Sequence, residues 1–280
     1  MHAAFLTAPF VDVSVRDVLA LADRVDARAL ELAISDRGLL APGSCDDDQL
    51  RMIEQIRQGG CEVAAIAAYY LVTGSDEEAE LAPRVLTQAI EVAARADIPV
   101  VSTVAGFPID HDRERTITNI LPDLLGPLLA RAGELGVAVA FENWYRTNLR
   151  DLDHWRLFFQ AFPAEHVGLV FDPSHLEWMR IDWRAALEEF SARVRLAHVK
   201  DVAYDQERLR RVGVLGSNWW RYVLPGRGVI TTESYLRALR AAGYDGALSI
   251  EHEDSDYGPA DGIEAAAAEV NRAIASIALD

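Results

Sequence analysis

Short apolar runs alternate with longer amphipathic stretches along the whole chain. A short apolar run is typical of a buried strand, whereas apolar residues spaced three and four apart are typical of a helix. The pattern predicts eight strands, at residues 3–8, 29–34, 62–70, 99–103, 137–142, 167–172, 194–200 and 247–251. It predicts helices that start near Ser14 and cover 46–58, 75–96, 115–135, 151–161, 182–190, 233–242 and 260–277.

This alternation indicates an α/β fold with a parallel sheet. Eight strand–helix pairs in 280 residues match a (β/α)8 barrel better than a doubly wound sheet, which usually has fewer strands. No GxGxxG pattern follows the first strand, and no phosphate-binding loop pattern occurs. We therefore predict a single TIM barrel, with residues 1–280 forming one domain. Within helix 115–135, Pro122 and Pro127 predict a break or kink.

The connection after the seventh strand is unusually long. It covers 202–230, whereas connections after barrel strands usually have about 2–6 residues. It contains Trp219, Trp220, Arg221 and Tyr222, followed by the sequence PGRG. A long aromatic loop on the catalytic face of a barrel is expected to act as a lid or as a wall of the substrate site.

Four metal-ligand residue types stand at or near the carboxyl ends of the last four strands. They are Glu142, Asp172, His198 and Glu251. A single acidic residue at a strand end is more often a helix cap or an ion-pair partner, but barrel enzymes carry their chemistry at this edge. Three carboxylates and one imidazole suit a divalent ion such as Mn²⁺, Co²⁺, Mg²⁺ or Zn²⁺. We predict one metal site here, with positions left open for substrate oxygens.

Lys200 follows the predicted histidine ligand by two residues and is the only lysine in the chain, since the other basic residues are arginines. A compact ammonium is not interchangeable with a guanidinium, so we assign Lys200 a catalytic role. Asp201 is expected to hold His198 or Lys200 in place. His175 is expected to reach the open face of the metal, and Trp144 to form part of the pocket wall.

Composition narrows the choice of partner. The net charge of −17 disfavours a nucleic-acid partner, because phosphate binding needs a basic face. The N-terminal residues lack a signal-peptide pattern, and no apolar run is long enough to span a bilayer. The two cysteines, Cys45 and Cys61, are predicted to be free thiols. These features predict a cytoplasmic protein that acts on a small molecule.

Several short motifs resemble one known family. The runs ENW at 142, FDPSHLEWMRID at 171, HVKD at 198, WWRYVLPGRG at 219 and LSIEHED at 249 resemble the sugar phosphate isomerase/epimerase family, the xylose isomerase-like TIM barrels. The resemblance covers nearly the whole chain. It implies that Glu142, Asp172, His198 and Glu251 bind one divalent ion, Mn²⁺ in first place, with His175 and Arg221 near the substrate.

In the ketose epimerases of that family, two glutamates form the acid–base pair, and the resemblance assigns this role to Glu142 and Glu251. The sequence differs from two groups of related enzymes. The predicted ends of strands two to four lack the extra histidines of the related trinuclear apurinic endonucleases. Ketose epimerases also tend to carry Glu and Arg after the metal histidine, where this chain has Val199, Lys200 and Asp201.

The resulting hypothesis is a metal-dependent sugar isomerase or epimerase that transfers a proton next to a carbonyl. One alternative is a lyase or dehydratase acting on a 3-keto sugar, similar to inosose dehydratase or to a C-glycoside deglycosidase subunit; Trp220 and its neighbours would then contact an aryl group. The other is a non-catalytic carbohydrate-binding barrel. The partner is predicted to be a small carbohydrate substrate, with a homo-oligomer or a partner subunit as further alternatives.

Overall fold

Eight parallel strands close into a barrel in the computed structural model, which describes residues 1–279. The order around the barrel is β1-β10-β7-β6-β5-β4-β3-β2. The strands are β1 (His2–Leu6), β2 (Ala29–Ala33), β3 (Glu62–Ala67), β4 (Val100–Thr103), β5 (Ala138–Glu142), β6 (Val167–Phe171), β7 (Val194–Val199) and β10 (Ala247–Ile250). The predicted (β/α)8 barrel is confirmed.

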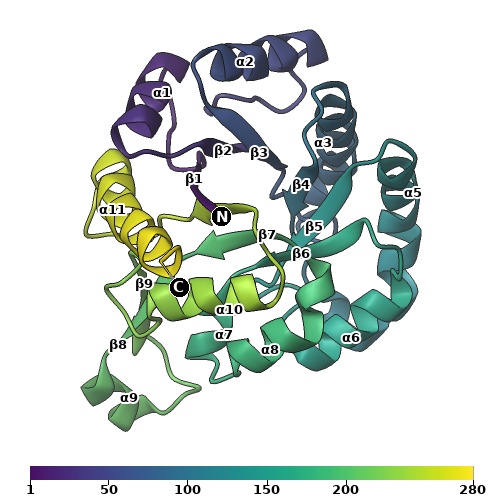
Figure 1. Ribbon diagram of the computed structural model, residues 1–280. Helices are drawn as coiled ribbons and strands as arrows, with labels where there is room; N and C mark the ends of the chain where they lie inside the picture. Colours follow the sequence, from purple (N-terminus) through teal and green to yellow (C-terminus); the bar gives the residue numbers. More distant parts are fainter. Residues whose placement is uncertain (280) are drawn as a thin grey trace.

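Helices surround the barrel and alternate with its strands (Figure 1). The outer helices are α1 (Val15–Arg24), α2 (Asp46–Gln58), α3 (Asp76–Arg95), α5 (Leu121–Glu134), α6 (Leu152–Ala161), α8 (Trp183–Phe190), α10 (Thr232–Ala241) and α11 (Pro259–Ile277). Shorter helices lie in the connections: α4 (Arg113–Arg115), α7 (Pro173–Trp178) and α9 (Gln206–Val212). Ser14 caps α1, as predicted, by accepting a hydrogen bond from the Asp17 amide. No helix among residues 1–279 is long and apolar enough to cross a membrane.

The helix predicted over 115–135 is interrupted just before Pro122, but Pro127 lies inside α5 without ending it, so the break predicted at Pro127 is wrong. A π-helical turn, Thr116–Ile120, precedes α5, and Pro122 lies in the first turn of α5. A proline is tolerated there because the first amides of a helix have no intrahelical acceptor. Both cysteines are free, as predicted, with Cys61 buried and Cys45 exposed.

The connection after β7 is more ordered than the predicted loop. It contains a two-stranded antiparallel sheet formed by β8 (Asp201–Tyr204) and β9 (Trp220–Val223), with α9 between them. This β8–α9–β9 unit projects from the barrel at the lower left of Figure 1.

Side chains of the barrel strands mostly alternate between the barrel interior and the surrounding helices. In β2, for example, Leu30 and Leu32 pack outward against the helices, whereas Ala29 and Ala33 belong to small apolar clusters inside the barrel. Alternate residues of a strand point to opposite faces, so Glu31 points inward with the two alanines. The same phase directs Glu142, His198 and Lys200 to the interior at the carboxyl edge of the barrel.

Candidate metal centre

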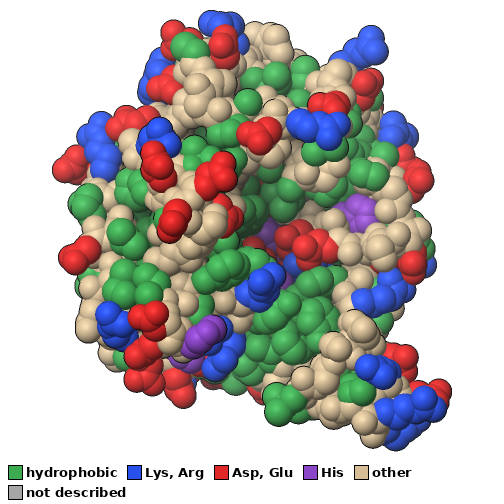
Figure 2. Space-filling view, turned by 180° about the vertical axis from the view of Figure 1, so that it is seen from behind, with side chains coloured by type: hydrophobic (Ala, Val, Ile, Leu, Met, Phe, Trp, Pro, Cys, Tyr) green, Lys and Arg blue, Asp and Glu red, His purple; other side chains and the backbone are tan. Residues whose placement is uncertain are grey.

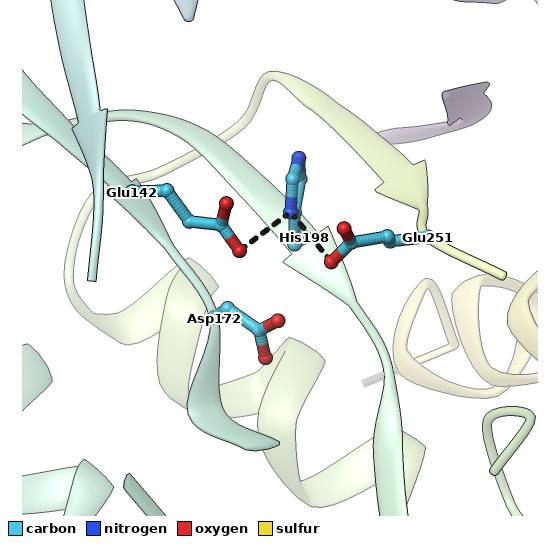
Figure 3. Close-up of side chains that lie close together, drawn as sticks. All are labelled: Glu142, Asp172, His198 and Glu251. Atoms are coloured by element: carbon cyan, nitrogen blue, oxygen red, sulfur yellow. Dashed lines mark ion pairs between the residues drawn. The ribbon is translucent and has the colours of Figure 1, made fainter. Parts of the chain in front are cut away.

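The four predicted ligands meet at the carboxyl ends of four neighbouring strands. Glu142 ends β5, Asp172 follows β6, His198 lies in β7 and Glu251 follows β10. One ligand atom from each lies within 4.8 Å of the others. Figure 3 shows the carboxylates of Glu142 and Glu251 pointing toward His198 from either side. His198 Nδ1 is 3.2 Å from Glu251 and 3.7 Å from Glu142.

The chemistry of this donor set fits a divalent cation. His198 Nδ1 and Asp172 Oδ2 are buried and have no hydrogen-bond partner among the described residues. Buried polar atoms without a hydrogen bond are costly, and an ion shared between them would satisfy both. Three carboxylates this close also repel one another unless positive charge lies between them. The residues therefore fit the ion that the sequence predicts.

Glu31 orients His198 through the ring nitrogen that faces away from the other candidate ligands. This residue was not predicted from the sequence. It is fully buried, and its Oε2 lies 3.0 Å from His198 Nε2. Ser102, Ser249 and Tyr69 donate hydrogen bonds to the same carboxylate. A proton assigned to Nε2 by this contact leaves the Nδ1 lone pair free for an ion, the usual carboxylate–histidine arrangement of metal sites. Burial opposes ionisation, but His198 and these hydrogen bonds lower the pKa of Glu31.

Lys200 places a buried ammonium beside the ligands. Its Nζ lies 3.0 Å from Asp172, 2.5 Å from Glu251 and 2.9 Å from Glu253. The Asp172 contact lacks hydrogen-bond geometry, so it is an ion pair only. Burial by itself disfavours the charge, but these carboxylates raise the pKa of Lys200 well above its usual value. Lys200 is therefore a charged group, unsuited to Schiff-base formation in this state.

The electrostatic environments of the two candidate acid–base glutamates differ. For Glu142, the contacts with His175 and His198 outweigh burial and lower the pKa well below its usual value. For Glu251, burial dominates and raises the pKa, helped by the charges of Glu142 and Glu253 and opposed by Lys200.

A second group of side chains forms the wall of a cavity of about 320 Å³ above the ligands. We call it the carboxylate cavity; its lining includes Tyr69, Glu142, Trp144, His175, Lys200, Glu251 and Glu253. His175 Nε2 lies 3.0 Å from Glu142, and its Nδ1 lies 2.6 Å from the Tyr222 hydroxyl. Lys200 Nζ also lies 4.4 Å from the centre of the Tyr222 ring. His175 and Trp144, two of the predicted site residues, therefore both line the carboxylate cavity.

Two residues predicted to bind substrate, Arg221 and Trp220, do not line the carboxylate cavity. Arg221 pairs with Asp254 and Asp256 and is half exposed, away from the carboxylate cavity. Trp220 stacks on Trp178 with 4.3 Å between ring centroids, and it too lies outside the lining of this cavity. The alternation of β9 explains the result for Arg221, because neighbouring residues of a strand point to opposite faces. Tyr222, which shares its face of β9 with Trp220, is the residue of this strand that reaches His175 and Lys200.

Asp201 anchors the long connection rather than His198 or Lys200. Its carboxylate accepts hydrogen bonds from the amides of Val202, Gly228 and Ile230. Position 228 has to be glycine, because a Cβ there would lie 2.5 Å from Asp201 Oδ1 and 2.2 Å from the Val202 carbonyl oxygen. Asp201 therefore holds the end of the connection against β8 instead of positioning His198 or Lys200.

Replacing Asp201 with alanine is expected to lower the free energy of unfolding by about 3 kcal/mol, because three backbone amides, two of them in buried hydrogen bonds, lose a charged acceptor. Urea unfolding followed by circular dichroism measures this change. Asp23→Ala, at an exposed position on α1, is the matched control and should leave the midpoint almost unchanged. Equal midpoints for the two variants would contradict the anchoring role.

Comparison with known families supports the fold independently. The family model described as "Xylose isomerase-like TIM barrel" matches residues 19–274. Among curated proteins, inosose dehydratase of Geobacillus thermodenitrificans is 26% identical over 141 residues, which cover 48% of this chain and 47% of that protein. The uncharacterized protein YfiH of Bacillus subtilis is 32% identical over 107 residues, covering 35% and 34%. The chain thus spans about half or less of the length of these relatives.

Solved structures share the barrel over nearly the full chain. A xylose isomerase domain protein from Planctomyces limnophilus has a TM-score of 0.76 at 19% identity, covering 99% of this chain and 97% of that one. The IOLI protein with a bound zinc atom has a TM-score of 0.73 at 18% identity, covering 99% and 98%. L-ribulose 3-epimerase has a TM-score of 0.69 at 18% identity, covering 99% and 93%. At these identities the likeness shows the fold.

Proposed function

Because the chain belongs to the xylose isomerase-like TIM barrel family, we propose that it is a divalent-metal-dependent isomerase or epimerase of a small sugar, keto-sugar or polyol. The observation that carries this proposal is the placement of two glutamates, Glu142 and Glu251, on either side of one cavity together with His198 and Asp172. A structural neighbour, L-ribulose 3-epimerase, is named for a reaction of this class.

Glu142, Asp172, His198 and Glu251 would hold the ion, and we propose Mn²⁺ first because three oxygen donors and one imidazole suit it. Mg²⁺, Co²⁺ and Zn²⁺ remain alternatives, and the zinc atom of the IOLI protein supports the last of these. When bound, such an ion polarises a carbonyl and its neighbouring hydroxyl oxygen.

The chain's own residues then account for the proton transfer. One glutamate carboxylate removes a proton from the carbon next to the carbonyl, and the other returns a proton, either to the opposite face or to the neighbouring carbon. His175 holds Glu142 through its 3.0 Å contact and is itself held by Tyr222. The Lys200 ammonium offsets the negative charge that develops on the substrate oxygen. Trp144 limits the access of water on one side of the cavity.

A dehydratase is the second candidate, favoured by the alignment with inosose dehydratase. It would use the same first step, removal of a proton next to a carbonyl. The leaving hydroxyl would then need a proton, and Lys200 or His175 is placed to donate it.

The test is a panel of keto-sugars and keto-polyols, incubated in D₂O with Mn²⁺ and followed by NMR. The proposed reaction incorporates deuterium next to the carbonyl and gives a product of unchanged composition. Loss of water with formation of an unsaturated ketone indicates the dehydratase instead. A panel in which no substrate exchanges a carbon-bound proton would contradict both.

Metal binding is expected to stabilise the fold. Mn²⁺ at one hundred times its dissociation constant should add about 2.7 kcal/mol to the free energy of unfolding, because the ion binds the folded chain alone. Thermal unfolding with Mn²⁺ and with EDTA measures this difference.

Asp172→Asn is the informative variant for this effect. Asp172 also caps α7 by accepting from the Ser174 amide, and asparagine can retain that cap while losing the charge. Its stabilisation by Mn²⁺ should shrink strongly. Asp182→Asn is the matched control because Asp182 also caps a helix, α8, and is not a member of the cluster. Equal stabilisation of both variants would contradict Asp172 as a ligand.

A further inference from the structure

A second, larger cavity lies beside the carboxylate cavity. It measures about 830 Å³, and we call it the arginine cavity; its lining includes Phe107, Arg113, Tyr145, Arg146, Arg150 and Trp178. Figure 2 shows an extended hydrophobic surface next to the hollow that contains acidic and histidine side chains. None of these three arginines is among the predicted site residues.

The two cavities share a wall of aromatic rings. Phe107 of the arginine cavity packs on Trp144 of the carboxylate cavity, with 5.7 Å between centroids. Likewise, Tyr145 lines the arginine cavity and His175 the carboxylate cavity, and their ring centroids are 6.1 Å apart. A molecule that reaches over these rings therefore contacts both cavities.

The charge of the arginine cavity is opposite to that of the protein. Three guanidinium groups face one carboxylate, Asp151, in a chain with a net charge of −17. Asp151 is already engaged by Arg150 and by the ring and amide of His154. Neither Arg113 nor Arg146 forms an ion pair with a carboxylate among the described residues: Arg113 donates to the Thr147 carbonyl, and Arg146 lies over Phe107 and Trp144.

Arg113 is the most constrained of the three. It is half-buried, and both burial and the charge of Arg150 lower its pKa. Arg113 and Arg150 line the same cavity at partly buried positions, and arginine binds carboxylate and phosphate with matched geometry.

The rest of the lining is apolar. Tyr145 and Trp178 meet edge to face at 4.8 Å, and Met179 and Ile181 continue the surface. Leu215 at the rim, in the β8–α9–β9 unit, is 99% exposed. An exposed leucine at the mouth of a cavity gains most from a ligand with an apolar face.

We propose that the arginine cavity binds a carboxylate or phosphate carried on a flat apolar body, and that this group is the far end of the substrate whose carbonyl end occupies the carboxylate cavity. The assignment to the substrate rests on the proposed function. The binding of the anion itself rests only on the residues of the arginine cavity.

Calorimetric titration of the full chain with benzoate and with phenyl phosphate tests this inference, and it distinguishes the two anions. EDTA is present throughout, so that neither probe can bind through an ion at the four ligands. Benzyl alcohol tests the need for charge, and inorganic phosphate tests the need for the apolar body. At least one aryl anion is expected to bind one to one, at least roughly tenfold more tightly than both controls.

Arg113→Met should weaken that binding by roughly tenfold, because a charge-assisted contact is lost. Arg146→Met, at an exposed position, is a second variant without risk to the fold, and it should also weaken binding. Arg16→Met, exposed on α1, is the matched loss of charge and should have no effect. Glu142→Gln should bind the probe like the unchanged chain, because it alters only the carboxylate cavity.

Benzyl alcohol binding as tightly as both anions, or unchanged affinity in both Arg113→Met and Arg146→Met, would overturn the inference. The same holds if neither aryl anion binds. An inactive protein that binds benzoate would refute the proposed function and leave the anion site standing. An active protein that binds neither anion would refute the anion site alone.

Discussion

Replacing Glu142 with glutamine is expected to lower metal-dependent turnover by about 10²–10⁴-fold, the usual contribution of a positioned acid or base. Glutamine keeps the shape of the side chain and one oxygen for the ion, but it cannot accept a proton. Glu251→Gln should cause a loss of similar size from the other side of the cavity. The measurement is the initial rate on the keto-sugar that exchanges deuterium most rapidly in the panel.

Two controls separate chemistry from folding. Glu54→Gln, at an exposed position on α2, should keep full activity. Deuterium exchange in the two site variants shows which step is lost, because the variant that lacks the base cannot wash in solvent deuterium. Full turnover in both Glu142→Gln and Glu251→Gln would refute the proton-transfer mechanism.

Replacing Lys200 with methionine is expected to lower the free energy of unfolding by about 3–5 kcal/mol in EDTA, the usual cost of removing one partner from a buried ion pair. Asp172 and Glu251 would lose their ammonium partner and face each other without compensating charge. Mn²⁺ should recover much of this loss, because the ion supplies positive charge at the same place. Urea unfolding with EDTA and with Mn²⁺ measures both effects.

Lys200→Arg is the conservative comparison. It should keep metal binding, but a planar guanidinium cannot reproduce the contacts of the compact ammonium with Glu253 and the Tyr222 ring, so turnover should fall. Arg84→Met, exposed on α3, serves as the control for loss of a positive charge. Full activity of Lys200→Arg, or an unchanged stability of Lys200→Met in EDTA, would contradict the importance assigned to this lysine.

The barrel and the cluster of four candidate ligands could be predicted because each rests on local sequence. A buried strand shows in a short apolar run, and a ligand at its carboxyl end shows as a polar residue where that run stops. Glu142, His198 and Glu251 satisfy this pattern on different strands, and the parallel arrangement brings them together.

Glu31 escaped prediction because it lies within a strand rather than at its end. The sequence ALELA alternates, so Glu31 has the same phase as Ala29 and Ala33, and this phase points into the barrel. A charged residue in that phase is a signal for a buried partner, and the alternation would have revealed it. Its partner, His198, lies 167 positions away in the sequence, so the pairing itself depends on the closed barrel.

The β8–α9–β9 unit could not be predicted from local sequence patterns. Its two strands pair 201–204 with 220–223 across an intervening helix, and no short hairpin turn marks the connection. Without that pairing, Arg221 and Tyr222 cannot be assigned to faces of the strand. This is why the arginine was expected near the substrate and the tyrosine was not singled out.

An anomalous difference map from crystals grown with Mn²⁺ tests the central claim, that one ion is held at the carboxyl edge of the barrel. The account predicts a single strong peak among the four side chains, in contact with Asp172 Oδ2 and His198 Nδ1, the two buried atoms that have no hydrogen-bond partner. The peak should disappear in Asp172→Asn and remain in Asp182→Asn. A peak elsewhere in the molecule, or no peak with Mn²⁺ in excess, would contradict the account.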